Sequence, residues 1–253
     1  MKKLLLEIKD LHKKFGKLEV LKGVNISVEK GEKIVILGSS GSGKSTALRC
    51  VNLLETPTSG QILYNGEDIT KQNINKYRKK VGMVFQNFNL FPNMSVLENI
   101  TLAPKTFGDD TAENIEKKAI ELLKRVGLED KKDVYPNSLS GGQKQIVSLA
   151  RLTLSHPRVV LLDEPTTGLD EQTERQALGV LAQWAHDKTV VVVTHRLQVL
   201  PMVNRVVVVD NGRVIIDGPR DAVIAKLREN EEHQAQAVQA QAQKAAQVAA
   251  EKK

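Results

Sequence analysis

The sequence predicts an α/β fold in which helices cover both faces of a mainly parallel sheet. Several short segments are almost uniformly apolar, as expected for strands whose two faces are both buried. A glycine-rich loop follows the first of these segments and leads directly into a helix, a strand–loop–helix unit that belongs to α/β proteins. The apolar segments are Ile34–Leu37, Val81–Phe85, Val159–Leu162, Val190–Val193 and Arg205–Val209.

The N-terminal part of the chain is predicted to add antiparallel strands. Two short strands are expected at Leu4–Ile8 and Leu18–Val28, the second one interrupted by a turn at Lys22-Gly23. A further strand, Gln61–Tyr64, ends at Asn65-Gly66, a dipeptide that favours tight hairpin turns. We therefore expect a small antiparallel β subdomain beside the parallel sheet.

From about residue 87 to residue 143 the sequence changes to helical patterns. Ser95 and Glu98 have the spacing of a capping box, in which each side chain bonds to the backbone N–H of the other residue. A long amphipathic helix is expected over Asp110–Val126 and should stop at Gly127. These patterns predict a helical subdomain inserted into the α/β core, within one domain that spans residues 1–228.

Composition and charge limit the classes of protein that this sequence fits. Its residues are 41% hydrophobic and 26% charged, as in soluble globular proteins, and we expect no signal peptide or membrane span. The net charge of +7 comes from lysines mixed with acids, with 4% aromatic residues, so no nucleic-acid partner is expected. The single cysteine, Cys50, excludes an internal disulfide and is expected to be a core residue. The Ala/Gln-rich residues 229–253 should form a helical or disordered tail.

The glycine-rich loop after Ile34–Leu37 has the spacing of a phosphate-binding loop. Its backbone N–H groups and the positive end of the following helix form a site for phosphate oxygens. Lys44 should reach the outer phosphates and the Ser45 hydroxyl should hold Mg²⁺, while glycine at 41 and 43 lets the backbone approach phosphate closely. The sequence therefore predicts a nucleoside triphosphate site made by Gly38, Ser39, Ser40, Gly41, Ser42, Gly43, Lys44, Ser45 and Thr46.

Two carboxylates, Asp163 and Glu164, follow the apolar segment Val159–Leu162. The carboxyl edge of a parallel sheet would bring them beside the phosphate loop. Asp163 suits an indirect or water-mediated contact with Mg²⁺, and Glu164 suits a general base for the water that attacks the γ-phosphate. Strands often end in acids at turns, but the position of this pair after a phosphate loop favours the functional interpretation.

A second anion-binding sequence, Leu139-Ser140-Gly141-Gly142-Gln143, opens another predicted helix. One chain cannot fold both surfaces around a single nucleotide, whereas two chains placed head to tail can. Together with the phosphate loop and Asp163-Glu164, this segment resembles the ATP-binding cassette (ABC) family over residues 1 to about 228. The resemblance implies a RecA-like P-loop core, ATP and Mg²⁺ as ligands, a homodimer in ATP and separate transmembrane transporter subunits. It also implies a cytoplasmic protein on the inner face of the cell membrane.

The resemblance assigns roles to further residues. Phe15 matches the aromatic residue that stacks on adenine, although packing in the core is an alternative. Gln86 matches the glutamine that contacts Mg²⁺ and the attacking water, and Gly168-Leu169-Asp170 matches the segment that crosses the dimer interface. His195 matches the switch histidine that contacts the γ-phosphate. The expected catalytic residues are thus Glu164, His195 and Gln86, and the expected metal-binding residues are Ser45, Gln86 and Asp163.

Within the family, the two halves of the chain resemble different subfamilies. Residues 1 to about 140 look like the ATPases of polar amino-acid importers, especially over Phe88–Ile100. Residues from about 145 to 228 look like type I secretion and peptide exporters, because Glu171 and Arg196 stand where importers usually have proline and an acid. We therefore hypothesise a chimera, engineered or recombined, that is joined near residues 138–146 and has reduced stability where strands of both parts share a sheet.

The sequence leaves several functions open. The first is a Mg²⁺-dependent ATPase subunit of an ABC transporter, which hydrolyses ATP at the interface of a head-to-tail dimer to drive importer-type membrane subunits. The second is a chimeric cassette that binds ATP without coupling to transport. The third is a soluble ABC ATPase associated with DNA or ribosomes. Such proteins generally have long coiled coils or paired cassettes, and this sequence has neither.

Overall fold

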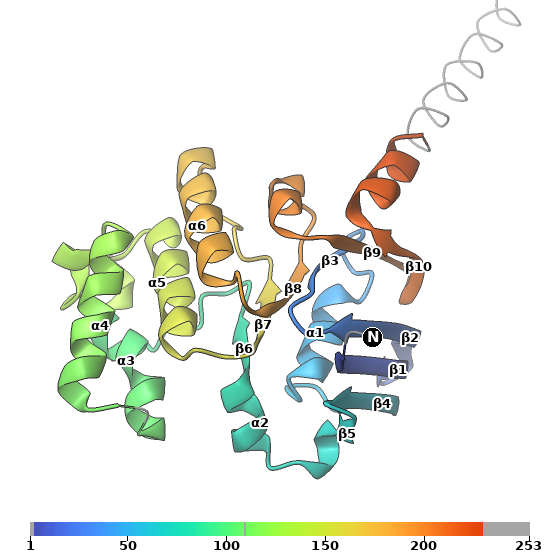
Figure 1. The fold of residues 1–253 in the computed structure, drawn as a ribbon, viewed down its shortest axis with the longest axis horizontal. Coiled ribbons are helices and arrows are strands. Elements are labelled where there is room, and N and C mark those ends of the chain that lie inside the picture. The colour runs from blue at the N-terminus through green and yellow to red at the C-terminus, as the bar shows by residue number, and fades with distance from the viewer. Residues whose placement is uncertain (1–2, 109, 230–253) are drawn as a thin grey trace, which may run out of the picture.

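The fold consists of two sheets and a group of helices (Figure 1), and the computed structural model describes residues 3–108 and 110–229. The larger sheet has the strand order β10-β9-β3-β8-β7-β6, and all neighbouring strands in it are parallel except β9 and β10. The mainly parallel sheet is therefore confirmed. Its strands are β3 (Lys33–Leu37), β6 (Val81–Val84), β7 (Val159–Asp163), β8 (Thr189–Val193), β9 (Arg205–Asp210) and β10 (Arg213–Pro219).

The valine-rich strands of this sheet are buried on both faces. Every residue of β7 and β8 is buried. Alternate residues point to opposite sides, so that Ile34 and Ile36 join one hydrophobic cluster while Val35 and Leu37 join another. The register aligns Ile36 with Val193 on one side of β3, so the carboxyl ends of β3 and β8 lie together. This edge of the sheet carries the phosphate loop.

The smaller sheet is antiparallel, with the strand order β2-β1-β4-β5, as expected for the N-terminal part. The turn predicted at Lys22-Gly23 is wrong, because the second strand runs through it without a break. Gly23 has φ of +82° and lies where the pairing of β1 with β2 changes register, so a β-bulge accommodates the turn-forming residue inside the ladder. Asn65-Gly66 does join β4 to β5 as a hairpin, with φ positive at both residues. The strands are β1 (Leu4–Phe15), β2 (Leu18–Glu29), β4 (Ser59–Tyr64) and β5 (Glu67–Asp68).

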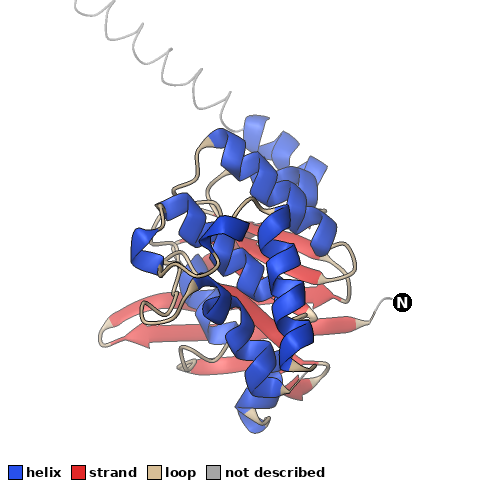
Figure 2. Ribbon diagram, turned by 90° about the vertical axis from the view of Figure 1, so that its left-hand side faces the viewer, coloured by secondary structure: helices blue, strands red, loops and turns tan. Residues whose placement is uncertain are grey.

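Three helices form the inserted subdomain at the left of Figure 1, and in Figure 2 they face the viewer with the strands behind them. Ser95 caps the first of them through the predicted capping box with Glu98. The second helix ends just before Gly127, which has φ of +71°. The third continues beyond residue 143, so that Leu152 reaches the core of the larger sheet. These helices are α3 (Val96–Phe107), α4 (Ala112–Arg125) and α5 (Gly141–Leu154).

The remaining helices were predicted only in part. Helix α1 (Lys44–Val51) is the helix expected after the phosphate loop. Helices α2 (Ile74–Lys80) and α6 (Glu171–Trp184) have no counterpart among the predicted elements, and a further helix covers 220–229. The tail predicted over 229–253 lies outside the described residues except for its first residue. Short 3₁₀ helices are η1 (Ile69–Lys71), η2 (Glu129–Lys131), η3 (Pro136–Ser138) and η4 (Leu197–Met202).

Two hydrophobic clusters cover the two faces of the larger sheet, and another lies within the helical subdomain. One cluster joins the sheet to α1 and to the antiparallel strands, and it includes Cys50, which is buried as predicted. The other joins the sheet to α5 and α6, where Leu149 and Leu181 pack against the strands. None of the helices over the described residues combines the length with the apolar character that crossing a membrane requires.

Candidate functional site

The phosphate loop connects β3 to α1, and the Lys44 side chain folds back to contact the backbone of the loop. The Lys44 Nζ donates hydrogen bonds to the backbone oxygens of Gly38 at 2.9 Å and Ser39 at 2.7 Å. Burial lowers the pKa of Lys44, against the opposing charges of Glu164 and Asp163. The loop thus presents a buried ammonium group and the N-terminus of a helix at one place, a combination that attracts phosphate.

Gly41 and Gly43 serve the conformation of the loop itself. Both residues have left-handed backbone conformations, with φ of +78° and +101°. A Cβ added at Gly43 would lie 2.7 Å from Leu21 Cδ2, while one added at Gly41 meets no atom within 4 Å. The loop therefore requires glycine at these positions for its own conformation, before any contact with phosphate is considered.

Ser45 and Asp163 meet although 118 residues separate them in the sequence. The Ser45 hydroxyl donates a hydrogen bond of 2.6 Å to Asp163 Oδ1. Asp163 is 0% exposed, and its Oδ2 has no hydrogen-bond partner among the described residues. Burial raises the pKa of Asp163, and the hydrogen bond from Ser45 opposes this effect. The structure thus brings two of the three predicted metal-binding side chains together and leaves one buried carboxylate oxygen available for a cation.

Glu164 is held by the segment that follows β8. Its Oε2 accepts a hydrogen bond of 2.9 Å from the Thr194 hydroxyl, and its Oε1 lies 2.9 Å from Nδ1 of His195. Its backbone is strained, with φ of +49°, and the hydrogen bond from its N–H to Val193 O fixes that conformation. Glu164 and His195, which were predicted separately as catalytic residues, are therefore in contact. Thr194 is part of the same arrangement and was missed, because a threonine at a strand end carries no distinctive signal.

The segment Ser140–Gln143 lies at the start of α5 and caps that helix. The Ser140 hydroxyl accepts from the Gln143 N–H, and the Gln143 side chain accepts from the Ser140 N–H, which forms a capping box. A Cβ added at Gly142 would lie 3.3 Å from Leu169 Cδ2, so this helix start lies against the predicted interface segment. Within the described chain, no hydrogen bond or ion pair joins Ser140–Gln143 to the phosphate loop.

Asp170, the predicted interface residue, is the N-cap of α6. Its carboxylate accepts hydrogen bonds from the backbone N–H and the hydroxyl of Thr173, and these bonds lower its pKa. The side chain is exposed, as is the Ser140 side chain at the start of α5. Both segments therefore lie on the surface of the single chain, where a second chain can reach them.

Phe15 and Gln86 lie at the ends of strands β1 and β6. Phe15 is 46% exposed, so the alternative that it packs in the core is wrong. The ammonium group of Lys13 lies 4.7 Å from the centre of its ring. Gln86 is exposed two residues after the end of β6. Both side chains are accessible to a ligand, as their predicted roles require.

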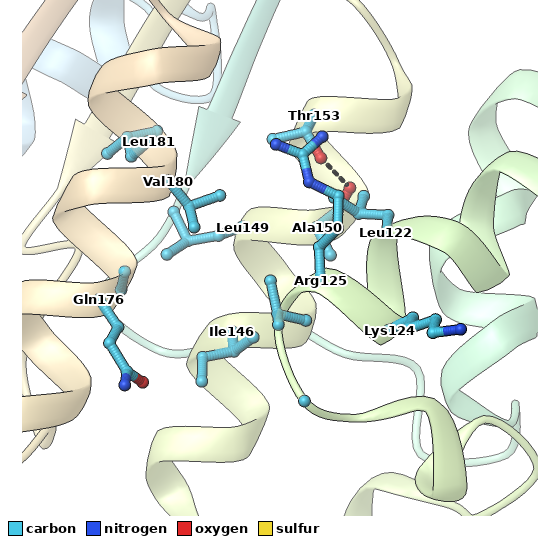
Figure 3. A pocket seen from close by; sticks show the side chains of 13 residues that line it. Leu122, Lys124, Arg125, Ile146, Leu149, Ala150, Thr153, Gln176, Val180 and Leu181 are labelled. Atoms are coloured by element: carbon cyan, nitrogen blue, oxygen red, sulfur yellow. Dashed lines mark hydrogen bonds between the residues drawn. The ribbon is translucent and has the colours of Figure 1, made fainter.

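A groove of about 510 Å³ lies between α4, α5 and α6 and is shown in Figure 3. Leu122 and Arg125 border it from α4, Ile146 and Leu149 from α5, and Val180 from α6. None of the predicted site residues lines this groove. It lies between the helical subdomain and helix α6, which covers the sheet, and it is separate from the phosphate loop and the carboxylates described above.

Comparison with known proteins identifies relatives of the whole folded part. The chain is 43% identical over 218 residues to the arginine transport ATP-binding protein ArtM of Bacillus subtilis, a match covering 85% of this chain and 91% of that protein. It is 41% identical over 223 residues to the glutamine transport ATP-binding protein GlnQ of Geobacillus stearothermophilus, covering 87% and 92%. Because a match over 85% of the chain must span residues 138–146, the comparisons give no support for an exporter-like second half or for a chimera.

A solved structure shows the same fold with a nucleotide. The dimeric post-hydrolysis state of the ATP-binding cassette MJ0796 bound to ADP and Pi matches with a TM-score of 0.79 and 36% identity, covering 85% of this chain and 99% of that one. The family model for the ABC transporter matches residues 21–167, which include the phosphate loop, Ser140–Gln143 and Asp163-Glu164. These matches agree with the fold and with the grouping of Lys44, Ser45, Asp163 and Glu164. The chain therefore belongs to the ABC transporter family, as an ATP-hydrolysing cassette.

Proposed function

We propose that two copies of this chain, placed head to tail, hydrolyse ATP in a magnesium-dependent reaction that drives separate membrane subunits. The contact between Ser45 and Asp163 carries the proposal, because it joins the phosphate loop to the carboxylates at the end of β7. The alternative of an ABC ATPase associated with DNA or ribosomes is not favoured by the named relatives, which are transport ATP-binding proteins.

The residues fit a magnesium ion. Ser45 supplies a hydroxyl oxygen, and Asp163 supplies a buried carboxylate with one oxygen that has no hydrogen-bond partner in the described chain. Oxygen ligands of this kind are those that Mg²⁺ prefers, usually together with water and substrate phosphates. Gln86 would add a side-chain oxygen from the end of β6. When bound, Mg²⁺ would neutralise charge on the phosphate oxygens during transfer.

Glu164 is the proposed general base. Hydrogen bonds from Thr194 and His195 orient its carboxylate, which would accept a proton from the water that attacks the γ-phosphate. Lys44 would exchange its bonds to backbone oxygens for bonds to phosphate oxygens. In this proposal His195 both orients Glu164 and contacts the γ-phosphate.

The second copy would complete each site. Ser140, Gly141, Gly142 and Gln143 would contact the nucleotide of the partner chain with the N-terminus of α5, and Asp170 would lie in the interface. The neutral N-terminus of this helix, with two glycines and no acidic residue in its first turn, supports the assignment. Phe15 would stack on adenine at the rim of the site, where its exposed ring is available.

The partners would be importer-type membrane subunits for polar amino acids. Relatives named for arginine and glutamine transport support this substrate class. The contact with these subunits is proposed near Gln86 and the helical subdomain, and the chain would then work on the cytoplasmic face of the membrane. Copurification with amino-acid importer subunits tests this part of the proposal.

The decisive experiment compares Mg²⁺-ATP hydrolysis by the purified chain and by Glu164→Gln, with oligomeric state measured by size exclusion in ATP. We expect the variant to lose turnover while it accumulates an ATP-bound dimer. The matched control is Glu121→Gln, which makes the same substitution at an exposed residue of α4 and should hydrolyse ATP normally. Turnover that persists in Glu164→Gln contradicts the proposed base.

The composite origin of the chain remains a separate hypothesis. The hypothesis predicts a loss of stability in the sheet that both parts would share. However, Ile34, Val160 and Val192 in that sheet are each 0% exposed, as in a well-packed core. The groove between α4, α5 and α6 is a better place for imperfect packing, because helices from both parts border it. Separate comparison of residues 1–137 and 147–228 with importer and exporter ATPases tests the hypothesis, and one lineage matching both parts equally well refutes it.

A further inference from the structure

A nearly buried ion pair connects the segment after β8 to helix α6. Arg196 follows His195, and its Nη1 lies 2.9 Å from Oε2 of Glu174, whose side chain is 3% exposed. Neither residue takes part in the site described above. We propose that Arg196 and Glu174 are positioning residues, which hold Thr194 and His195 against Glu164 and link them to the interface end of α6.

The first half of this link is the backbone of residues 194–196. The Arg196 N–H donates a hydrogen bond of 3.0 Å to the Thr194 hydroxyl oxygen, and that hydroxyl donates in turn to Glu164 Oε2 at 2.9 Å. Because the oxygen of Thr194 accepts from Arg196, its single proton is directed at the carboxylate. Movement of Arg196 would therefore change the orientation of the Glu164 carboxylate through one intervening hydroxyl.

The second half of the link is the first turn of α6. Glu174 donates its backbone N–H to Asp170 O at 2.8 Å, and Asp170 caps the helix through Thr173. The side chain that holds Arg196 and the residue proposed for the dimer interface are thus fixed to the same helical turn. A displacement of this turn when a second chain binds would reach Glu164 through Arg196.

Stability alone is a weak reason for this pair. Burying two charges costs desolvation, and paired charges in protein interiors often stabilise no more than apolar side chains of similar size. Glu174 Oε1 also has no hydrogen-bond partner among the described residues, so the carboxylate is only half satisfied. Packing does little for the neighbouring His195, whose side chain is 67% exposed. The ion pair therefore holds the backbone of residues 194–196 where few packing contacts hold the His195 side chain.

The test uses steady-state ATP hydrolysis and rests on the proposed function of Glu164. We expect Arg196→Met and Glu174→Gln each to lower kcat by about 10- to 100-fold, the range expected when catalytic groups shift by about an ångström. The KM for ATP should change by less than about twofold, because Lys44 and the phosphate loop are untouched. Arg175→Met is the matched control, since it breaks an exposed ion pair with Glu171 on the same helix and should leave kcat unchanged.

The double variant Arg196→Met with Glu174→Met separates positioning from stability. Each single variant leaves one buried charge unpaired and should lower the thermal unfolding midpoint. Removing both charges should bring this midpoint back close to that of the unaltered chain, while kcat stays low. Recovery of kcat together with the midpoint would overturn the inference, since the pair would then be merely structural. Hydrolysis that is lost in Glu164→Gln but unaffected in Arg196→Met also overturns it and leaves the proposed function intact. Absence of any hydrolysis sensitive to Glu164→Gln refutes the proposed function itself.

Discussion

Asparagine in place of Asp163 removes a buried charge and keeps the size of the side chain. Asp163 is 0% exposed, its Oδ2 has no hydrogen-bond partner among the described residues, and burial raises its pKa above the ordinary value of 3.8. An unsatisfied buried polar group costs about 1–3 kcal/mol, and more when it is charged. Asparagine would still leave the two N–H donors of its amide without partners, but it carries no charge, so we expect a net stabilisation of about 1 kcal/mol.

The assay is thermal unfolding of the nucleotide-free chain, in which about 1 kcal/mol corresponds to about 2–4 °C for a protein of this size. The sign of the pH dependence follows from the raised pKa. The folded chain holds the Asp163 proton more tightly than the unfolded chain, so this group loses stability as the pH rises from about 3.8 through the folded-state pKa. The advantage of Asp163→Asn should therefore grow as the pH rises through the folded-state pKa and vanish in acid, while the variant loses ATP hydrolysis.

Asp68→Asn is the matched control with the opposite sign. The Thr70 hydroxyl and N–H lower the pKa of Asp68, so its charged form is favoured in the folded chain and removing the charge should not stabilise it. A lower unfolding midpoint for Asp163→Asn at neutral pH would refute the reasoning. An advantage that is equally large in acid would refute it as well, because the effect would then not come from the charge.

Three further changes test the local arguments. Gly43→Ala should destabilise the chain by about 1–2 kcal/mol in urea unfolding, because φ is +101° and the new Cβ would lie 2.7 Å from Leu21 Cδ2. Tyr77→Phe should cost about 1 kcal/mol in the same assay, since the Tyr77 hydroxyl donates to Val51 O at 2.6 Å inside the core. Cys50 should resist alkylation at pH 8 until the chain unfolds, because burial raises its pKa to about 11. Rapid labelling of the folded chain would contradict that last expectation.

The parts of the fold that the sequence predicts well are those in which local pattern and tertiary setting agree. The apolar run Val159–Leu162 allows little besides a strand that is buried on both faces, and its burial follows. The turn predicted at Lys22-Gly23 is wrong because the neighbouring strand decides whether a turn-forming dipeptide reverses the chain or is accommodated in a β-bulge. That partner, β1, carries Asp10 with φ of +46° at the neighbouring register shift of the ladder. The sequence of β2 alone contains no information about it.

The candidate site shows the same division. Lys44, Ser45 and Glu164 were found because their spacing in motifs reflects what the backbone must do around phosphate. Thr194 and Glu174 were missed because their roles depend on contacts with residues 30 and 22 positions away in the sequence.

The residues that local rules disfavour gather at this site. Lys44 and Asp163 are charges held where burial shifts their pKa toward the neutral form, and Glu164 adopts φ of +49°. Such features persist only where the surrounding structure enforces them. Here Asp163 is the last residue of the fully buried strand β7, and Glu164 and Thr194 directly follow β7 and β8. The packing of these strands therefore offsets the cost of the strained and buried groups. Substitutions that relieve these features should therefore stabilise the nucleotide-free chain and reduce hydrolysis together, which is the pattern that Asp163→Asn is designed to reveal.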